Sequence, residues 1–256
     1  MIQFDRLEKE KEELRNRFLL AKPFPHLVID NFCDTQKLHQ LVSEMPDIDT
    51  KSRDYVFAAN KFEKSKFAGL SPLFKELYDD LTSEQFEKFL CFISNETVFI
   101  DKNFHGGGIH QGKKNSFLDM HLDFNYHPLH KNWYRNLNLL LYLNEGWQPE
   151  YGGQLQLEDL RSGEKTAIEI PFNRMVIQQT RNFTLHGYHK TNFPEGKSRT
   201  SVASYAYTIH KHLIEKPRTT DWHVGDDEVV KKFLARMYGP AVKLKNKLFG
   251  SATAKH

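Results

Sequence analysis

The chain has 256 residues, of which 39% are hydrophobic, 13% aromatic and 27% charged, with a formal net charge of +3. This composition predicts a packed core beneath a charged surface, and the length suits one domain. It excludes a disordered chain, and the lack of a long apolar run argues against a membrane-spanning helix or a membrane partner.

The two ends of the chain favour a cytoplasmic protein without a nucleic-acid partner. Residues 1–18 are charged where a signal peptide has an apolar core, so we expect a cytoplasmic location. From Lys211 onward, ten Lys and Arg residues accompany five Asp and Glu residues, but apolar residues recur between them at helical spacing. We therefore interpret these lysines as the solvated face of a helix. Cys33 and Cys91 fit reduced thiols better than a disulfide framework.

Helices dominate the prediction for residues 1–94. Apolar residues from Phe4 to Phe18 recur on one face of a charged helix, and PFPHLVIDNF at 23–32 indicates an extended strand. Asp34 is a candidate N-cap for the next helix. A further stretch with helical periodicity predicts a helix over 71–92.

A change of rhythm after residue 94 predicts a β-rich region. Strands are expected at 96–100, 117–122, 137–143, 153–158, 166–170, 174–178, 183–188 and 200–208, with turns such as HGGG and RSGEK between them. Eight short strands predict a mainly β fold with flanking helices, built on a double-stranded β-helix of the jelly-roll, cupin-like kind. We expect a single domain over 1–256, with N-terminal helices and a first strand at 1–94, this core at 95–210 and a helical extension at 211–256.

Three residues suggest a metal site. His121 and Asp123 lie two apart in a predicted strand, so their side chains point to the same side. With the distant His186 they provide two imidazoles and one carboxylate, the usual ligands of Fe(II) in non-haem oxygenases. His189 competes with His186 for the third position. A buried core histidine and a turn aspartate are the alternative interpretation of the HxD pair.

Seven segments, in order, resemble the core of the prolyl 4-hydroxylase-like 2-oxoglutarate-dependent oxygenases over about residues 95–210. They are HGGGIHQ, FLDMHLDFNYHP, RNLNLLLYLNEGW, YGGQLQLED, PFNRMVIQQT, LHGYH and PEGKSRTSVASYAYT. The resemblance implies that His121, Asp123 and His186 bind Fe(II). It also implies that the enzyme consumes O2 and 2-oxoglutarate, hydroxylates an unactivated C–H bond, and releases succinate and CO2.

The same resemblance implies a binding site for the cosubstrate. Arg199 would bind the distal carboxylate of 2-oxoglutarate, and the planar fork of arginine suits a carboxylate better than the point charge of lysine. Tyr142 would add a hydroxyl group to that carboxylate, and Ser201 would add a weaker contact. A core aromatic is the alternative interpretation of Tyr142, since LNLLLYL is apolar enough to be buried on both faces.

The substrate is expected to be a small or carrier-tethered metabolite, with a peptidyl proline as the alternative and a catalytically silent metal-binding scaffold as a third possibility. Loops at the mouth of the site should select it. The candidate residues are Asn125, Tyr126, His127, His189 and Lys61, the last within 54–67. That segment has no clear period, which suits either a cover over a polar or anionic substrate or irregular packing.

Other histidines and aromatics are less informative. His105, His110, His127 and His130 could form a second metal site, but their spacing favours surface or pocket positions. The segment Trp133 to Arg135 could form a rim contact of the site or anchor the start of a strand.

Overall fold

The computed structural model describes residues 1–46, 48 and 56–223. Its helices are α1 (Phe4–Leu20), α2 (Thr35–Ser43), α3 (Pro72–Leu81) and α4 (Glu84–Ser94), with a 3-10 turn at Pro149–Tyr151. Its strands are β1 (His26–Asp30), β2 (Ala58–Lys64), β3 (Phe99–Ile100), β4 (Gly108–Leu122), β5 (Trp133–Tyr142), β6 (Leu155–Asp159), β7 (Lys165–Ile168), β8 (Arg174–Gln179), β9 (Thr184–Tyr188), β10 (Arg199–Ile209) and β11 (Asp221–Trp222).

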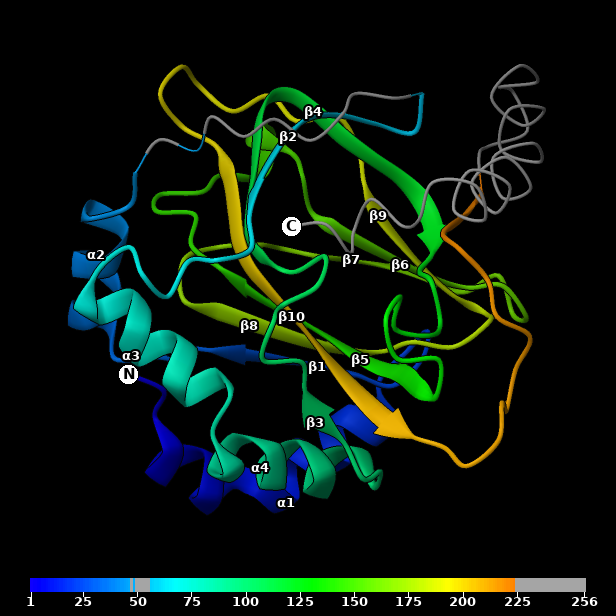
Figure 1. Cartoon of the computed structure of the whole chain (residues 1–256). Coiled ribbons are helices and arrows are strands. Elements are labelled where there is room, and N and C mark those ends of the chain that lie inside the picture. Colours follow the sequence, from blue (N-terminus) through cyan, green and yellow to red (C-terminus); the bar gives the residue numbers. More distant parts are fainter. Residues whose placement is uncertain (47, 49–55, 224–256) are drawn as a thin grey trace.

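The strands form one curled antiparallel sheet, which confirms the predicted mainly β, jelly-roll fold (Figure 1). Its order is β1-β8-β5-β10-β4-β9-β6-β7, and β2, β3 and β11 pair beside this path. The long strand β4 joins the two halves, because its first residues pair with β10 and its last residues pair with β9. The curl therefore brings β9 close to the end of β4.

The helices cover one face of the sheet, and the other face encloses the interior of the barrel (Figure 1). Alternation along β5 separates the two faces. Leu137, Leu139 and Leu141 pack in the large apolar cluster that includes residues of the four helices. Asn138, Leu140 and Tyr142 face the interior. No helix among the described residues is long and apolar enough to cross a bilayer.

Several predicted elements differ from the observed ones. The single helix expected over 71–92 is two helices, because Thr82 ends α3 and the Ser83 side chain caps α4 by accepting from Phe86 N. The segment 54–67, for which no regular element was predicted, contains β2, which pairs with β4. Residues 54 and 55 lie outside the described residues, as does 224–256, which holds most of the predicted helical extension.

A buried asparagine joins the first strand region to the barrel. Asn173 Oδ1 accepts from Cys33 N at 2.8 Å, and Asn173 Nδ2 donates to Cys33 O at 2.8 Å. Asn173 also has a φ of 61°, a conformation that costs other residues more than asparagine. The Asn173 side chain therefore satisfies the backbone of Cys33, and asparagine also tolerates the backbone conformation at this position.

We predict that Asn173→Ala lowers the free energy of unfolding by about 2–4 kcal/mol, because it leaves two buried backbone groups without partners and strains the backbone. Urea denaturation would measure the loss. Asn31→Ala is the matched control, since Asn31 has a φ of 51° but is exposed. Equal losses in the two variants would show that the Cys33 hydrogen bonds contribute nothing.

Candidate active site

The structure brings His121, Asp123 and His186 together. His121 lies near the end of β4 and pairs directly with His186 on β9. His186 Nε2 lies 3.3 Å from Asp123 Oδ2, and His121 Nε2 lies 3.6 Å from Asp123 Oδ1. His189 is exposed, so His186 supplies the third group of this cluster.

Each histidine has a feature that suits a metal ligand. His121 Nδ1 lies 2.9 Å from the carbonyl oxygen of Asp119, an acceptor for the Nδ1 proton, which leaves Nε2 for a metal. Burial, helped by the nearby His121, lowers the pKa of His186 to about 3. The His186 imidazole is therefore neutral at physiological pH.

Asp123 is held as a carboxylate. Asp123 Oδ2 accepts from Asn138 Nδ2 at 2.8 Å and lies 2.9 Å from Arg135 Nη2. Burial opposes the charge, but the groups around the carboxylate, above all the positive charge of Arg135, outweigh burial and hold the pKa of Asp123 well below its usual value. The metal would therefore meet a charged ligand.

Arg135 is a site residue that the sequence analysis missed. It was placed in a rim contact or a strand anchor, but it is only 2% exposed. Its guanidinium lies 3.4 Å from the centre of the Tyr205 ring and 4.7 Å from that of Phe124. The sequence did contain a signal for this role, because an arginine and an asparagine occur on a strand expected to be buried on both faces. Buried polar groups of this kind require polar partners.

Arg199, the first residue of β10, occupies another part of the interior. Its Nε donates to Gly153 O at 2.8 Å, and its Nη2 donates to Tyr142 Oη at 3.1 Å. Burial raises the pKa of the Tyr142 phenol, although Arg199 partly offsets this effect. Ser201 follows two residues later on the same face of β10 and pairs with Tyr142 in the sheet.

A cavity of about 180 Å³ connects these groups. Its lining includes the His121, Asp123 and His186 cluster as well as Arg199 and Ser201. The three candidate metal ligands and the candidate carboxylate-binding arginine therefore face one space. His110 also lines it, and burial lowers the pKa of this imidazole to about 4.

The residues considered for substrate binding lie in different surroundings. Lys61 on β2 lines the small cavity. The side chains of Asn125 and Tyr126 instead accept hydrogen bonds from the backbone of 214–218, and neither lines the cavity. His189 is exposed and outside the cavity lining.

A short strand from the C-terminal region lies beside the candidate metal ligands. Trp222 on β11 pairs with His121, and the two ring centres lie 4.9 Å apart. Trp222 also stacks on Phe57 at 5.0 Å and lines the cavity. The sequence analysis assigned 211–256 to a helical extension and therefore missed this contact.

Asp101, His105 and His127 form a second cluster. His105 Nδ1 lies 2.9 Å and His127 Nε2 lies 3.3 Å from Asp101 Oδ2. The amides of Leu129 and His130 donate to His127 Nδ1, so the proton of this ring is on Nε2. A metal at Nε2 would need a ring without either proton. We therefore interpret the cluster as a hydrogen-bonded loop anchor, and His127 is buried instead of lying at a surface or pocket.

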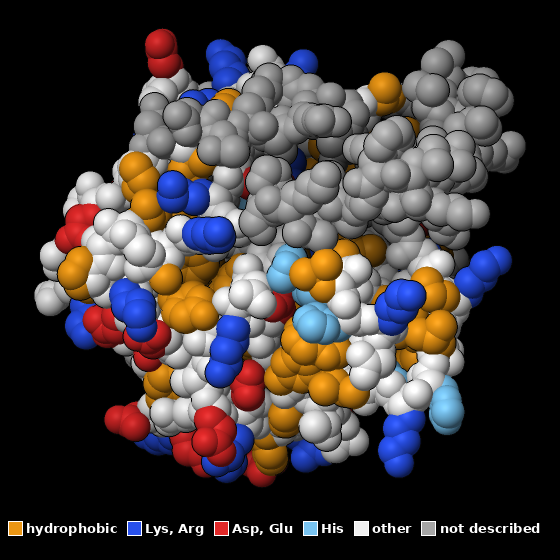
Figure 2. All heavy atoms as spheres, in the orientation of Figure 1, with side chains coloured by type: hydrophobic (Ala, Val, Ile, Leu, Met, Phe, Trp, Pro, Cys, Tyr) orange, Lys and Arg blue, Asp and Glu red, His pale blue; other side chains and the backbone are white. Residues whose placement is uncertain are grey.

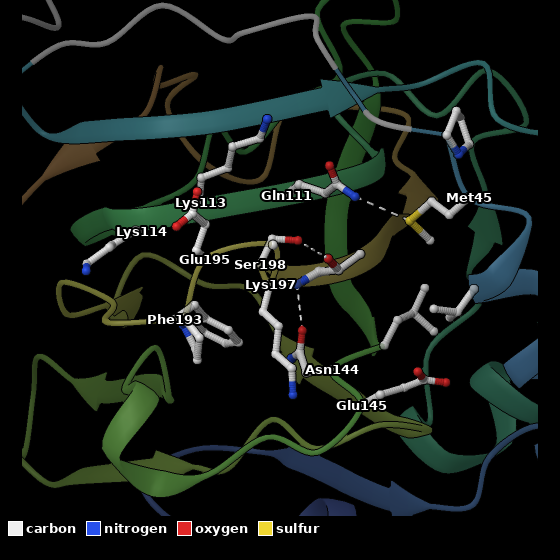
Figure 3. Close-up of a pocket in the computed structure, with 16 residues that line it drawn as sticks. Met45, Gln111, Lys113, Lys114, Asn144, Glu145, Phe193, Glu195, Lys197 and Ser198 are labelled. Carbon is white, nitrogen blue, oxygen red and sulfur yellow. Dashed lines mark hydrogen bonds between the residues drawn. The ribbon is translucent and has the colours of Figure 1, made fainter.

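A larger cavity of about 770 Å³ lies outside the barrel site (Figure 3). Lys113, Lys114 and Lys197 line it together with Glu145 and Glu195. It contains none of the candidate metal ligands. On the face in Figure 2, basic and acidic side chains are likewise interspersed, so charge there does not single out a binding surface.

The residues of the small cavity fit Fe(II) and 2-oxoglutarate. Two imidazole nitrogens and a carboxylate oxygen match the ligands that non-haem iron prefers, and the His121 tautomer leaves Nε2 available. Arg199 supplies a cation suited to a carboxylate. Tyr142 is not among the residues that line the cavity, but its hydroxyl contacts Arg199 at 3.1 Å.

Comparisons with known proteins agree with this chemistry. Residues 107–207 match the model of the 2OG-Fe(II) oxygenase superfamily. Comparison of the whole sequence with curated proteins finds no match.

Solved structures share the fold at low sequence identity. A prolyl 4-hydroxylase from Phytophthora capsici is 17% identical with a TM-score of 0.57, covering 96% of this chain and 79% of its own. A prolyl hydroxylase from Trichoplax adhaerens, in complex with a hypoxia inducible factor peptide, is 14% identical with a TM-score of 0.57, covering 80% of this chain and 92% of its own. HygX from Streptomyces hygroscopicus, with nickel, 2-oxoglutarate and hygromycin B bound, is 13% identical with a TM-score of 0.50, covering 75% and 85%.

Members of the matched superfamily are oxygenases that use Fe(II) and 2-oxoglutarate. The matched segment contains His121, Asp123, His186 and Arg199, and the fold around it is that of the solved oxygenases. Over residues 107–207 the chain is therefore similar to the 2OG-Fe(II) oxygenase superfamily, and it shares the fold of solved members.

Proposed function

We propose that this chain hydroxylates an unactivated C–H bond of a small or carrier-tethered metabolite, using Fe(II) bound by His121, Asp123 and His186. The observation that supports it best is the placement of these three groups and Arg199 on one cavity. Arg199 would bind 2-oxoglutarate, with Tyr142 and Ser201 beside it.

The protein's own residues would hold and orient the reactants. Iron and 2-oxoglutarate supply the oxidising chemistry when bound, with O2 as the second cosubstrate. His121, Asp123 and His186 would hold the metal through two imidazole nitrogens and one carboxylate oxygen. Arg199, fixed by Gly153 O and Tyr142 Oη, would set the position of the distal carboxylate.

The lining of the cavity supports a polar substrate. Lys61 Nζ pairs with Glu63 Oε1 at 3.1 Å, and both residues line the cavity. A polar group of the substrate would therefore meet this ion pair.

Two alternatives remain distinct from this proposal. A prolyl hydroxylase acting on a peptide is the first, since one of the similar structures holds a peptide. A catalytically silent metal-binding scaffold is the second. Succinate formation stimulated by 2-oxoglutarate separates enzyme from scaffold, and a search for a metabolite that gains one oxygen separates the two substrate classes.

We also propose that the helices and the barrel are parts of one oxygenase domain. Apolar residues from all four helices share one core with β5, β8 and β10. Helices and strands would then unfold together in one transition.

The iron ligands give the first activity prediction. Asp123→Ala and His186→Ala should each lower 2-oxoglutarate-coupled product formation by more than roughly 100-fold, because loss of groups that only orient a ligand already costs 10–100-fold. His189→Ala is the matched control and should keep activity, since His189 is exposed. Loss of iron only in His189→Ala would move the third ligand to that residue.

The cosubstrate site gives a second prediction. Arg199→Ala should retain metal but weaken 2-oxoglutarate binding by about 2–5 kcal/mol, because it leaves a carboxylate unpaired in a buried site. Tyr142→Phe removes one neutral donor and should cost only about 0.5–1.5 kcal/mol. Calorimetric titration of 2-oxoglutarate would measure both, and near-native affinity in folded Arg199→Ala would contradict the assignment.

Substrate binding gives a third prediction. Lys61→Gln should raise the substrate KM while the affinity for 2-oxoglutarate stays unchanged. If Lys61 binds a charged group of the substrate, the free energy of substrate binding should weaken by about 1.5–3 kcal/mol. Tyr126→Phe is the control, because its hydroxyl contacts the backbone of 214–218 outside the cavity. Unchanged substrate kinetics in Lys61→Gln would place substrate entry elsewhere.

A further inference from the structure

A buried cation lies beside the carboxylate of the proposed metal site. Arg135 Nη2 is 2.9 Å from Asp123 Oδ2, and the Arg135 side chain is 2% exposed. The same oxygen accepts from Asn138 Nδ2 at 2.8 Å. Arg135 and Asn138 therefore both contact one oxygen of the proposed iron ligand.

Several contacts hold this cation in place. Arg135 Nε donates to Asn138 Oδ1 at 2.8 Å, which closes a triangle of polar contacts among Arg135, Asn138 and Asp123. The guanidinium also lies 3.4 Å from the centre of the Tyr205 ring and 4.7 Å from that of the Phe124 ring. A cation held by these contacts can set where the carboxylate of Asp123 lies.

The charge of Arg135 acts in opposite directions on the two reactants that the site would bind. It offsets the negative charge of Asp123, which lowers the attraction of the site for a metal cation. The same positive charge raises the attraction for 2-oxoglutarate, which is a dianion. Such effects are measurable in a partly solvated site, because the dielectric screening is weaker there than in bulk water.

We propose that Arg135 is a positioning residue that fixes and partly neutralises Asp123, and that it thereby weakens metal binding while strengthening 2-oxoglutarate binding. This inference rests on the proposed function of the same site. It goes beyond it by assigning a role to Arg135, which lines the same cavity and would act through Asp123.

The opposite signs provide the test. Ni(II) is titrated into the metal-free full-length protein, and 2-oxoglutarate is then titrated into the nickel-loaded protein, both by calorimetry. The variants are Arg135→Met, which removes the charge, and Arg135→Lys, which keeps it. Arg174→Met is the control for loss of an arginine, because Arg174 pairs with Asp30 and does not line the cavity.

In Arg135→Met we expect the Kd for Ni(II) to fall about tenfold and the Kd for 2-oxoglutarate to rise about tenfold, as for one unit charge several ångströms away in a partly solvated site. Arg135→Lys should stay within about threefold of the wild type for both, because it retains the charge. Arg174→Met should change neither. Thermal melting of the metal-free variants should show a lower midpoint for Arg135→Met, because Asp123 then lacks its partner.

Other outcomes overturn the inference. Weaker binding of both Ni(II) and 2-oxoglutarate in Arg135→Met would mean that Arg135 has only a structural role. The same conclusion would follow if Arg135→Met and Arg135→Lys both lost binding because they were partly unfolded. Unchanged affinities would remove its role altogether. If the wild-type protein binds no 2-oxoglutarate in the presence of Ni(II), the proposed function is wrong as well. The wild-type titration therefore tests the proposed function, and the variants test the role of Arg135.

Discussion

The pairing of β4 with β9 is the constraint on which the rest of the site depends. It sets His121 opposite His186 and so joins two candidate ligands that are far apart in sequence. Gly187 makes this approach possible, because a Cβ there would lie 2.6 Å from Leu118 O. This glycine lies inside β9, where the absent side chain leaves room for the backbone of β4.

Residues whose roles follow from local spacing could be predicted, and those whose roles depend on distant contacts could not. His121 and Asp123 follow from the two-residue period of a strand, and most strands of the core were located to within a few residues. Arg135 was misplaced because its ion-pair partner, Asp123, is twelve positions away in the sequence and on the other side of a loop. Trp222 was missed because the apolar pattern of 211–256 was interpreted as helical, whereas β4 recruits 221–222 as a strand. Tertiary pairing overrides such local preferences.

Strand β5 shows how the same segment stabilises the fold and forms the site. Three of its leucines, Leu137, Leu139 and Leu141, face the apolar cluster beneath the helices. On the other face, Asn138 contacts Asp123 and Tyr142 contacts Arg199. Because successive side chains alternate, the rigidity of the apolar face is transmitted directly to the polar face. The proposed iron and 2-oxoglutarate positions are therefore tied to one well-packed strand, which suits a reaction that needs its groups fixed to within a fraction of an ångström.

The residues that line the cavity come from two kinds of strand. One kind carries the candidate metal and cosubstrate residues, and the other carries residues that could select the substrate. The candidate ligands, Arg199 and Arg135 lie on β4, β5, β9 and β10 or directly beside them, within the continuous strand order of the sheet. Lys61 and Trp222 lie on β2 and β11, which among the described strands pair only with β4. A strand with one partner can change its side chains, or its length, with less effect on the core than a strand between two neighbours. Substrate preference in this chain would therefore change most readily through β2 and β11, while the metal and cosubstrate positions remain in place.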